Sequence, residues 1–258
     1  MATGVLVLVV GRATRLARFM SGDMKAYEAQ VTFGRATDTY DALGATTQET
    51  GRHPGRDALA AALAAFSGPI VQTPPAYSAK KIGGEAAYKL ARRDEVVLPA
   101  PVTVTVHGLE LNAYDQGVAT FSVRVSSGFY VRSLAHDLGT QLGTGAHLSA
   151  LRRTRAGAFG LGEALSWGSL VSGGAVARAA VLSIDRLLPE IPAVTLAPAD
   201  VARVKHGQTV QAVLQPGVTG PTLRLVDEGG RLVGMAEASP QPASSVAPSV
   251  LQPVVILG

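Results

Sequence analysis

The chain has 258 residues, of which 47% are hydrophobic and none is cysteine. This length allows one large domain or two unequal ones, and the lack of cysteine excludes disulfides, thiol catalysis and Cys-based zinc sites. The sequence contains no signal peptide and no apolar run of about 18 residues, so it predicts a cytoplasmic protein without a membrane span.

The formal net charge is +4, and the basic excess lies entirely in the first two thirds of the chain. Residues 1–170 carry 17 basic and 13 acidic side chains, whereas residues 171–258 carry 6 of each. Arginine outnumbers lysine by 18 to 5, which suits forked recognition of phosphate. A net charge of +4 is compatible with a surface that binds nucleic acid, and equally with charges that only keep the protein in solution.

The sequence opens with an almost wholly apolar run at residues 3–11, which is typical of a central strand covered on both faces. Arg12, Arg15 and Arg18 follow at helical spacing. They fit either a solvated helix face or a basic binding surface. Residues 24–33 then alternate between apolar and polar side chains, which predicts a half-buried strand.

An acidic segment at residues 34–44 contains Asp38 and Asp41. Two carboxylates three residues apart could suggest a metal loop, but a calcium loop needs more ligands at fixed spacing. Asp and Thr side chains readily bond to nearby backbone groups. The segment is therefore predicted to be a hydrogen-bonded turn, and no metal site is predicted.

A loop at residues 72–84 is entered through two prolines and left through two glycines. Proline stiffens the backbone and glycine loosens it. Lys80 and Lys81 lie between these boundaries beside an aromatic residue and hydroxyl groups. This mixture fits a loop that closes on a polyanion, although a plain surface loop is equally compatible with it.

The centre of the sequence is the segment that contains Arg132. Residues 101–114 and 118–125 are predicted to form a hairpin, and Ser133 is predicted to cap a helix whose apolar residues are Leu134, Leu138 and Leu142. This pattern puts Arg132 at the junction of a strand and a helix. A guanidinium there cannot lose its proton, so it requires a carboxylate, a phosphate or backbone carbonyls.

Three arginines at Arg152, Arg153 and Arg155 form a basic edge after the predicted helix. His147 just before them fits a structural role better than a catalytic one. Residues 189–192 contain two prolines and predict a linker. Short apolar runs and regular Gly/Pro punctuation beyond it indicate a small β domain, with a Pro-rich loop at 240–248.

Common catalytic motifs are missing. The sequence has no GxxxxGK[ST], strand-linked GxGxxG, HExxH or GxSxG, so ATP, nicotinamide, zinc and serine-hydrolase chemistry lack their usual support. We predict no cofactor. A small-molecule α/β enzyme therefore stays a weak alternative, which tight RNA binding with steep salt dependence would remove.

Several ordered segments together resemble the tRNA pseudouridine synthase B family. They are KAYEAQ at 25–30, GRATDTYDALG at 34–44, QTPPAYSAKKIGGEAAYKLAR at 72–92, SSGFYVRSLAHDLGTQLGTGAHLSALRRTRAG at 126–157 and LSIDRLLP at 182–189. The resemblance implies an α+β pseudouridine-synthase fold, with a mixed, mostly antiparallel sheet, flanking helices and a thumb-like loop. It implies a catalytic domain at 1–188 and a small PUA-like β domain at 189–258.

The family isomerises uridine 55 in the T-loop of tRNA. The resemblance implies that the target base is flipped out and that an Asp carboxylate acts as nucleophile without a cofactor. It assigns Arg132 to orient that Asp and Tyr27 to stack on the flipped base and assist catalysis. Tyr130 and Leu151 would line the pocket, while Lys80, Lys81, Arg152 and Arg153 would contact RNA. The expected partner is the T-arm of tRNA, and the expected state is a monomer.

The nucleophile segment of the family, GTLDPxATGVL, matches this chain only from its ATGVL portion, which falls at residues 2–6. The Asp is not in the printed sequence, and Asp38 and Asp41 match another family segment. We therefore expect the 258-residue polypeptide to be inactive, through a start at an internal Met or through natural loss of catalysis. A non-catalytic protein that binds and remodels tRNA is the main alternative.

The same mismatch has two expected structural consequences. An unpaired apolar edge at Val5–Val10 would make the polypeptide poorly soluble. Arg132 would sit without an anionic partner, at a cost of about 3–5 kcal/mol if it is buried.

Overall fold

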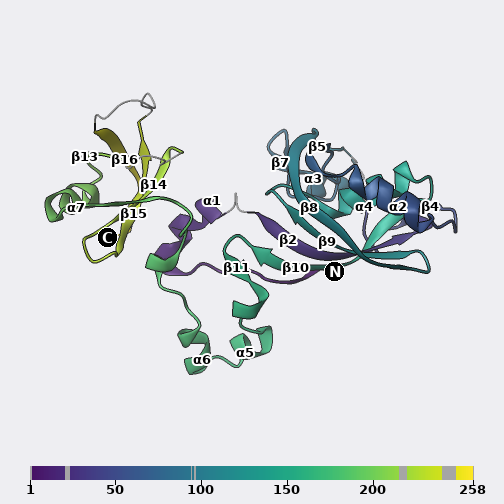
Figure 1. Ribbon diagram of the computed structural model, residues 1–258, viewed down its shortest axis with the longest axis horizontal. Coiled ribbons are helices and arrows are strands. Elements are labelled where there is room, and N and C mark those ends of the chain that lie inside the picture. The colour runs from purple at the N-terminus through teal and green to yellow at the C-terminus, as the bar shows by residue number, and fades with distance from the viewer. Residues whose placement is uncertain are drawn as a thin grey trace. The chain divides into compact units, whose positions relative to one another are not determined.

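The computed structural model describes residues 2–20, 24–93, 95, 97–214, 220–239 and 248–257 (Figure 1). The chain divides into two compact units. Unit 1 comprises residues 1–7 and 21–164, and unit 2 comprises residues 8–20 and 165–258. The division into domains at 1–188 and 189–258 stays a prediction.

Unit 1 is built on a seven-stranded sheet with the order β1-β10-β2-β9-β8-β5, in which β11 also pairs with β10. Only β1 runs parallel to its neighbour; every other pairing is antiparallel. The predicted mixed, mostly antiparallel sheet is confirmed. Its strands are β1 (Ala2–Gly4), β2 (Lys25–Phe33), β5 (Gly68–Gln72), β8 (Val102–Asp115), β9 (Val118–Val125), β10 (Ala146–Ala156) and β11 (Phe159–Gly160).

The alternating segments of the sequence form the central strands as predicted. β2 occupies the run predicted at 24–33, and β8 and β9 form the predicted hairpin. Gln116 and Gly117 connect β8 to β9 with φ angles of 46° and 78°. Two consecutive residues with positive φ suit the right-handed twist of a two-residue hairpin loop.

Helices of unit 1 cover one face of this sheet (Figure 1). α2 (Arg56–Ala64) and α4 (Val131–Gln141) contribute apolar side chains to the core that lies over β2, β8, β9 and β10. Leu134 and Leu138 of α4 are fully buried, which stabilises the fold by roughly 1.5–3 kcal/mol for each side chain. The apolar spacing predicted for this helix is therefore confirmed.

The predicted cap of α4 is wrong. The helix begins at Val131, and Tyr130 takes the N-cap position without a side-chain cap. Ser133 lies in the first turn, where its hydroxyl donates to the Thr73 carbonyl at 2.7 Å. The helix starts earlier because the Gln72 side chain holds the Tyr130 backbone. Its Oε1 atom accepts from the Tyr130 amide at 2.7 Å, and its Nε2 atom donates to the Tyr130 carbonyl at 3.0 Å.

The predicted central strand at residues 3–11 is also wrong. β1 ends at Gly4 and lies at the sheet edge, and Val5 donates a last backbone bond to the Arg153 carbonyl at 2.8 Å. Beyond it, no described strand pairs with the chain, so Leu6, Leu8 and Val10 are 69%, 61% and 66% exposed. Apolar composition alone did not reveal whether a covering strand exists. Poor solubility stays a prediction.

Unit 2 contains a five-stranded sheet with the order β12-β14-β15-β16-β13. Its strands and the helix α7 enclose a separate apolar core. This confirms the predicted C-terminal β domain, although residues 240–247 of the predicted Pro-rich loop lie outside the described residues. The elements are β12 (Ala193–Thr195), α7 (Pro198–Lys205), β13 (Val210–Ala212), β14 (Thr222–Val226), β15 (Leu232–Ala238) and β16 (Ser249–Ile256).

The arginines at helical spacing lie on the helical segment formed by η1 (Gly11–Leu16) and α1 (Ala17–Met20), which belongs to unit 2. Arg15 and Arg18 donate to the carbonyls of Ile256 and Val254 at 2.8 and 3.3 Å, and Arg12 donates to Leu257. These side chains therefore bond along β16 and the residue after it. Helical structure is confirmed, and the arginines contact backbone as well as solvent.

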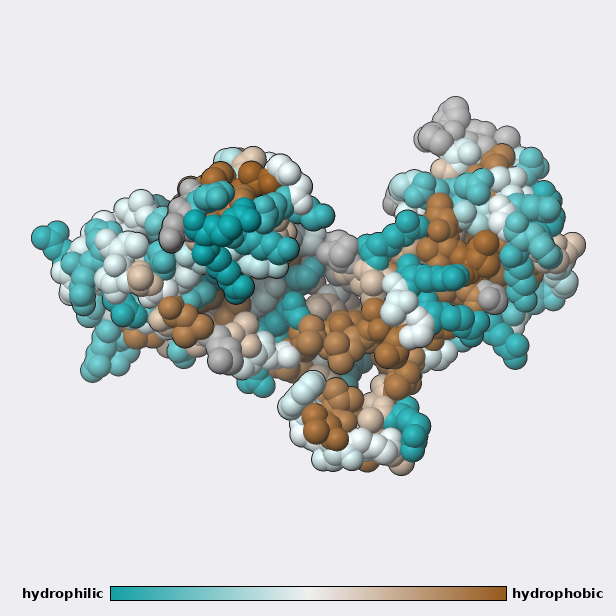
Figure 2. Space-filling view, turned by 180° about the vertical axis from the view of Figure 1, so that it is seen from behind, coloured by the Kyte–Doolittle hydropathy of each residue, from teal (hydrophilic) through white to brown (hydrophobic). Residues whose placement is uncertain are grey.

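The short helices of unit 2 expose several apolar side chains. α5 (Trp167–Val171) and α6 (Gly174–Ala179) form the lowest part of Figure 2, where brown surface is visible. Trp167, Val171 and Val176 are 74%, 66% and 58% exposed. A further short helix of unit 2 is η3 (Ile184–Arg186), whereas η2 (Leu161–Glu163) lies at the end of unit 1. Several exposed apolar side chains of unit 2 thus lie on this segment, and Leu8, Val10 and Val213 are exposed elsewhere in the unit.

A close approach between α4 and β10 provides a test of this packing. A Cβ atom added at Gly139 would lie 2.2 Å from the backbone nitrogen of Ala146. Because backbone cannot move aside cheaply, we predict that Gly139→Ala lowers the free energy of unfolding by about 1–3 kcal/mol. Gly162→Ala, which meets nothing within 4 Å, is the matched control. Equal urea midpoints for the two variants would contradict the described packing.

Candidate active site

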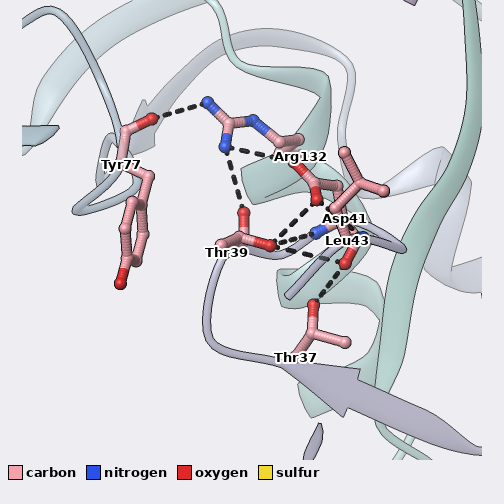
Figure 3. A network of polar contacts seen from close by, with 6 residues as sticks. All are labelled: Thr37, Thr39, Asp41, Leu43, Tyr77 and Arg132. Carbon is pink, nitrogen blue, oxygen red and sulfur yellow. Dashed lines mark hydrogen bonds and ion pairs between the residues drawn. The ribbon is translucent and has the colours of Figure 1, made fainter. Parts of the chain in front are cut away.

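Arg132 joins three parts of unit 1 (Figure 3). From the first turn of α4, its Nη1 atom donates to the Thr39 carbonyl at 3.1 Å and contacts Oδ2 of Asp41 at 3.4 Å. Its Nη2 atom donates to the Tyr77 carbonyl at 2.8 Å. The Arg132 and Asp41 side chains remain 24% and 26% exposed, so the guanidinium is held firmly but stays within reach of solvent.

Asp41 is held by its own turn as well as by Arg132. Its Oδ1 atom accepts from the Thr39 hydroxyl at 2.9 Å and from the Leu43 backbone at 3.1 Å. The Thr37 hydroxyl donates to the Asp41 carbonyl at 2.7 Å. The predicted hydrogen-bonded turn is therefore confirmed, and it presents a carboxylate to α4.

The turn is tied to the sheet. β3 (Arg35–Thr37) and β4 (Thr46–Glu49) pair beside it, and Leu148 of β10 donates to the Tyr40 carbonyl at 2.9 Å. Ala42 returns a bond to the Leu148 carbonyl at 3.0 Å. The position of the carboxylate is thus fixed by a central strand of the fold.

This geometry corrects the expectation that Arg132 would lack an anionic partner. Asp41 supplies the charge and two carbonyls accept further bonds, so the predicted burial cost does not arise. The sequence pattern could not reveal this pairing, because 91 residues separate the two side chains. The structural interpretation, an arginine tied to a carboxylate and to backbone carbonyls, is confirmed.

The loop at residues 72–84 reaches this network through its backbone. Tyr77 offers its carbonyl to Arg132. The exit of the loop forms β6 (Lys81–Ile82) and β7 (Glu85–Ala86), after which α3 (Ala87–Ala91) begins. Lys80 is half-buried, and Lys81 is exposed. The lysines therefore lie on a hairpin whose base is anchored to Arg132.

Tyr27 and Leu151 lie on neighbouring strands and face the helix-covered side of the sheet. Tyr27 is opposite Arg153, and Leu151 is opposite Ala29 of β2. Both are partly buried against the core that also contains Phe129 and Val131. Tyr130, at the start of α4, is half-buried as well. Tyr27 and Leu151 thus border the core to which α4, the helix that carries Arg132, contributes its apolar side chains.

The two arginines predicted to contact RNA point to opposite faces of the sheet. Arg152 is paired with Glu28 and is exposed, whereas Arg153 is paired with Tyr27, and neighbouring residues of a strand alternate between faces. The Nε atom of Arg153 donates to the Val5 carbonyl at 2.7 Å. The structure therefore does not bring Arg152 and Arg153 together on one surface.

His147 is buried, and its imidazole ring contacts Arg35. Its Nδ1 lies 2.9 Å from the Arg35 carbonyl, and its Nε2 lies 3.4 Å from Nη2 of Arg35. A neutral imidazole satisfies both contacts by donating from Nδ1 and accepting at Nε2. This supports the structural role predicted for His147. Within the described residues, no group of three or more acidic, His or Cys side chains could hold a metal ion.

Sequence reasoning missed a cluster beside Arg132. Tyr40 stacks on His136 with ring centroids 3.9 Å apart and planes 13° apart. Burial lowers the pKa of His136 and raises the pKa of the Asp137 carboxyl to about 6. The four-residue spacing of Arg132 and His136 is a signal that could have found this cluster, because such residues share a helix face.

Family models match nearly the whole chain. The model described as "TruB family pseudouridylate synthase (N terminal domain)" matches residues 1–131. Models described as "tRNA pseudouridylate synthase B C-terminal domain" and "Pseudouridine synthase II TruB, C-terminal" match residues 132–188 and 192–251. The chain belongs to the TruB family. The resemblance inferred from the sequence motifs is therefore confirmed.

Relatives and solved structures agree with this assignment. A tRNA pseudouridine synthase B from Symbiobacterium thermophilum is 46% identical, covering 79% of this chain and 68% of that protein. One from Solibacter usitatus is 38% identical, covering 99% and 86%. A crystal structure of a Cbf5-Nop10-Gar1 complex contains a chain with a TM-score of 0.76 and 22% identity, covering 100% of this chain and 73% of that one. It supports the TruB fold.

The described helices include none that is long and apolar enough to cross a membrane.

The ion pair at the centre of the site can be tested by removing its charge. Asp41→Asn keeps an oxygen for Thr39 and Leu43 but leaves Arg132 facing a neutral group. We predict that the free energy of unfolding falls by about 1 kcal/mol, because the pair is only partly buried. Urea denaturation at low salt measures the change. The exposed Asp115→Asn serves as control, and an equal effect of both variants would contradict the described pair.

The pKa of Asp137 predicts a pH-dependent stability. Because its folded pKa of about 6 lies above the usual 3.8, ionised Asp137 destabilises the fold; this penalty is absent below about pH 4 and complete above about pH 6. We predict that Asp137→Asn stabilises the chain at pH 7.5 by about 1 kcal/mol, after allowance for solvent exposure. The gain should vanish as the pH approaches 4. A gain independent of pH would contradict the assignment.

Proposed function

We propose that this chain has the site of a tRNA pseudouridine synthase, an isomerase that converts uridine 55 in the T-loop of tRNA, although residues 1–258 alone bind the RNA without turnover. The observation that carries the proposal is the Arg132 network, which joins α4, the Asp41 turn and the lysine-bearing loop within a chain of the TruB family. Relatives named tRNA pseudouridine synthase B support tRNA as the substrate. The T-arm as partner, a monomeric state and a cytoplasmic location belong to the same proposal.

The proposed reaction breaks the bond between N1 of uracil and C1′ of ribose and joins C1′ to C5 instead. A proton leaves C5 and N1 regains one, so atoms balance without a cofactor. The target base is flipped from the folded loop, at a cost of a few kcal/mol. An Asp carboxylate acts as the nucleophile during this exchange.

Each site residue has a proposed role. Arg132 orients the nucleophilic carboxylate and keeps it ionised, and Tyr27 stacks on the flipped base and assists in removing the C5 proton. Tyr130 and Leu151 line the base pocket. Lys80 and Lys81 contact phosphates from the loop.

Arg152 and Arg153 are proposed to contact different parts of the RNA. Arg153 shares the sheet face of Tyr27, whereas Arg152 faces the other side. We therefore propose that Arg153 contacts the RNA bound at the site. Arg152 would contact RNA that passes around the edge of the sheet.

The acid that the structure pairs with Arg132 is Asp41, and three contacts already occupy its oxygens. So constrained a carboxylate suits positioning rather than attack on ribose. We therefore propose that residues 1–258 bind the RNA but do not convert its target uridine to pseudouridine. The alternative function, binding and remodelling of tRNA without catalysis, is favoured by the same constraint on Asp41.

A tritium-release assay separates these functions. Purified residues 1–258 are mixed with a T-arm stem-loop that carries [5-³H]uridine at the target position, because formation of the new carbon bond releases tritium from C5. We predict binding that weakens steeply with salt and no tritium release. Release at a rate that exceeds the RNA-only control would contradict the proposed loss of turnover.

Two longer variants test the enzyme itself. One is the same chain preceded by a family segment that carries the GTLDPxATGVL pattern, and the other carries Asn in place of the added Asp. We predict release with the first and none with the second. If neither releases tritium although both bind the RNA, the non-catalytic alternative is supported. A lack of binding by residues 1–258 would contradict both functions.

A further inference from the structure

We infer that Tyr40 and His136 are positioning residues for Arg132. Their stacked rings fix the turn that presents the Thr39 carbonyl and the Asp41 carboxylate to the guanidinium. The inference rests on the proposed function only for the claim that Arg132 matters in catalysis. The physical coupling between the ring stack and Arg132 can be tested without any turnover.

Two residues of α4 contact the turn. Arg132 and His136 are four residues apart and therefore lie on the same helix face one turn apart. Opposite them, three consecutive residues of the turn make the contacts. Thr39 and Asp41 contact Arg132, and Tyr40 between them stacks on His136. The turn is thus attached to α4 at two successive helical turns.

The backbone of Tyr40 has an uncommon conformation. Its φ angle is 63°, a left-handed conformation that is unfavourable for a residue with a side chain. Glycine or asparagine would adopt it more easily. A tyrosine persists there because its surroundings hold it in place. The Tyr40 amide donates to the Thr37 carbonyl at 3.2 Å, and the ring is held by His136.

Burial favours the uncharged form of both stacked rings. His136 is partly buried, and its Nδ1 atom is buried without a hydrogen-bond partner. Burial therefore lowers the pKa of His136 and favours the neutral ring. Tyr40 likewise keeps its proton, because burial and the nearby Asp137 raise its pKa. Two neutral rings stacked in this way act through shape, so an uncharged aromatic residue should replace His136 without loss.

The consequence for the site follows from these contacts. If the stack is removed, Arg132 remains as the contact between the turn and α4 among those described above. The backbone bonds between Leu148 and the turn remain, so the Thr39 carbonyl and the Asp41 carboxylate keep their place beside β10 but lose one of the two contacts that hold them against α4. The orientation of Arg132 would therefore be less restrained even though every group that contacts it is unchanged.

The test is NMR of the arginine side chains in purified residues 1–258. Signals of the Arg132 guanidinium are assigned by their loss in Arg132→Lys, and their hydrogen exchange is measured. We predict exchange about two- to tenfold faster in His136→Ala, which reflects the loss of one aromatic pair. His136→Phe and Tyr40→Phe should keep the exchange rate of the unmodified chain.

Two further variants separate positioning from general loosening. Tyr40→Gly removes the ring but adopts the left-handed φ without strain, so it should fold and still speed exchange at Arg132. Tyr114→Leu breaks another aromatic pair in unit 1, in which Phe33 and Tyr114 lie edge to face with centroids 6.3 Å apart. It should lower the melting temperature and leave the Arg132 signals unchanged.

Three results would overturn the inference. The first is an unchanged Arg132 exchange rate in both His136→Ala and Tyr40→Gly. The second is equally fast exchange in His136→Phe, and the third is the same acceleration in Tyr114→Leu. A failure of the proposed function would look different, because the extended chain would release no tritium while the Arg132 signals still followed the ring stack.

Discussion

The guanidinium of Arg132 is the constraint on which the rest of the site depends. Its donors connect the Asp41 turn, the Tyr77 carbonyl and the start of α4, segments that are far apart in the sequence. An arginine is suited to this task because it presents several donors in a rigid plane and is always charged. The sheet provides the fixed frame, since Leu148 of β10 holds the turn on one side and Gln72 at the end of β5 holds α4 on the other.

The sequence allowed the local parts of this arrangement to be predicted. Strict alternation identified β2 and β9, and apolar spacing identified α4. Asp and Thr residues in a short segment predicted the turn. These features depend on neighbours within a few residues, so their signal is contained in the pattern itself. The ordered motifs also identified the TruB family, because several segments agreed along most of the chain.

The long-range parts could not be predicted in this way. The pairing of Arg132 with Asp41, the bond from Tyr77 and the opposite orientation of Arg152 and Arg153 depend on strand register and on contacts between distant segments. The start of α4 was misplaced for the same reason, because Gln72 rather than a local cap determines it. Residues 3–11 show the limit most clearly: a wholly apolar run predicts burial, but whether another strand covers it depends on the rest of the fold.

The arginine contacts along β16 affect the order in which unit 2 folds during translation. The helical segment that carries Arg12, Arg15 and Arg18 is synthesised 236 to 245 residues before the carbonyls that receive its bonds. Until those carbonyls leave the ribosome, the three guanidinium groups cannot bond along β16. The contacts between this segment and β16 therefore form late in the folding of unit 2, after β12, β14 and β15 have been synthesised.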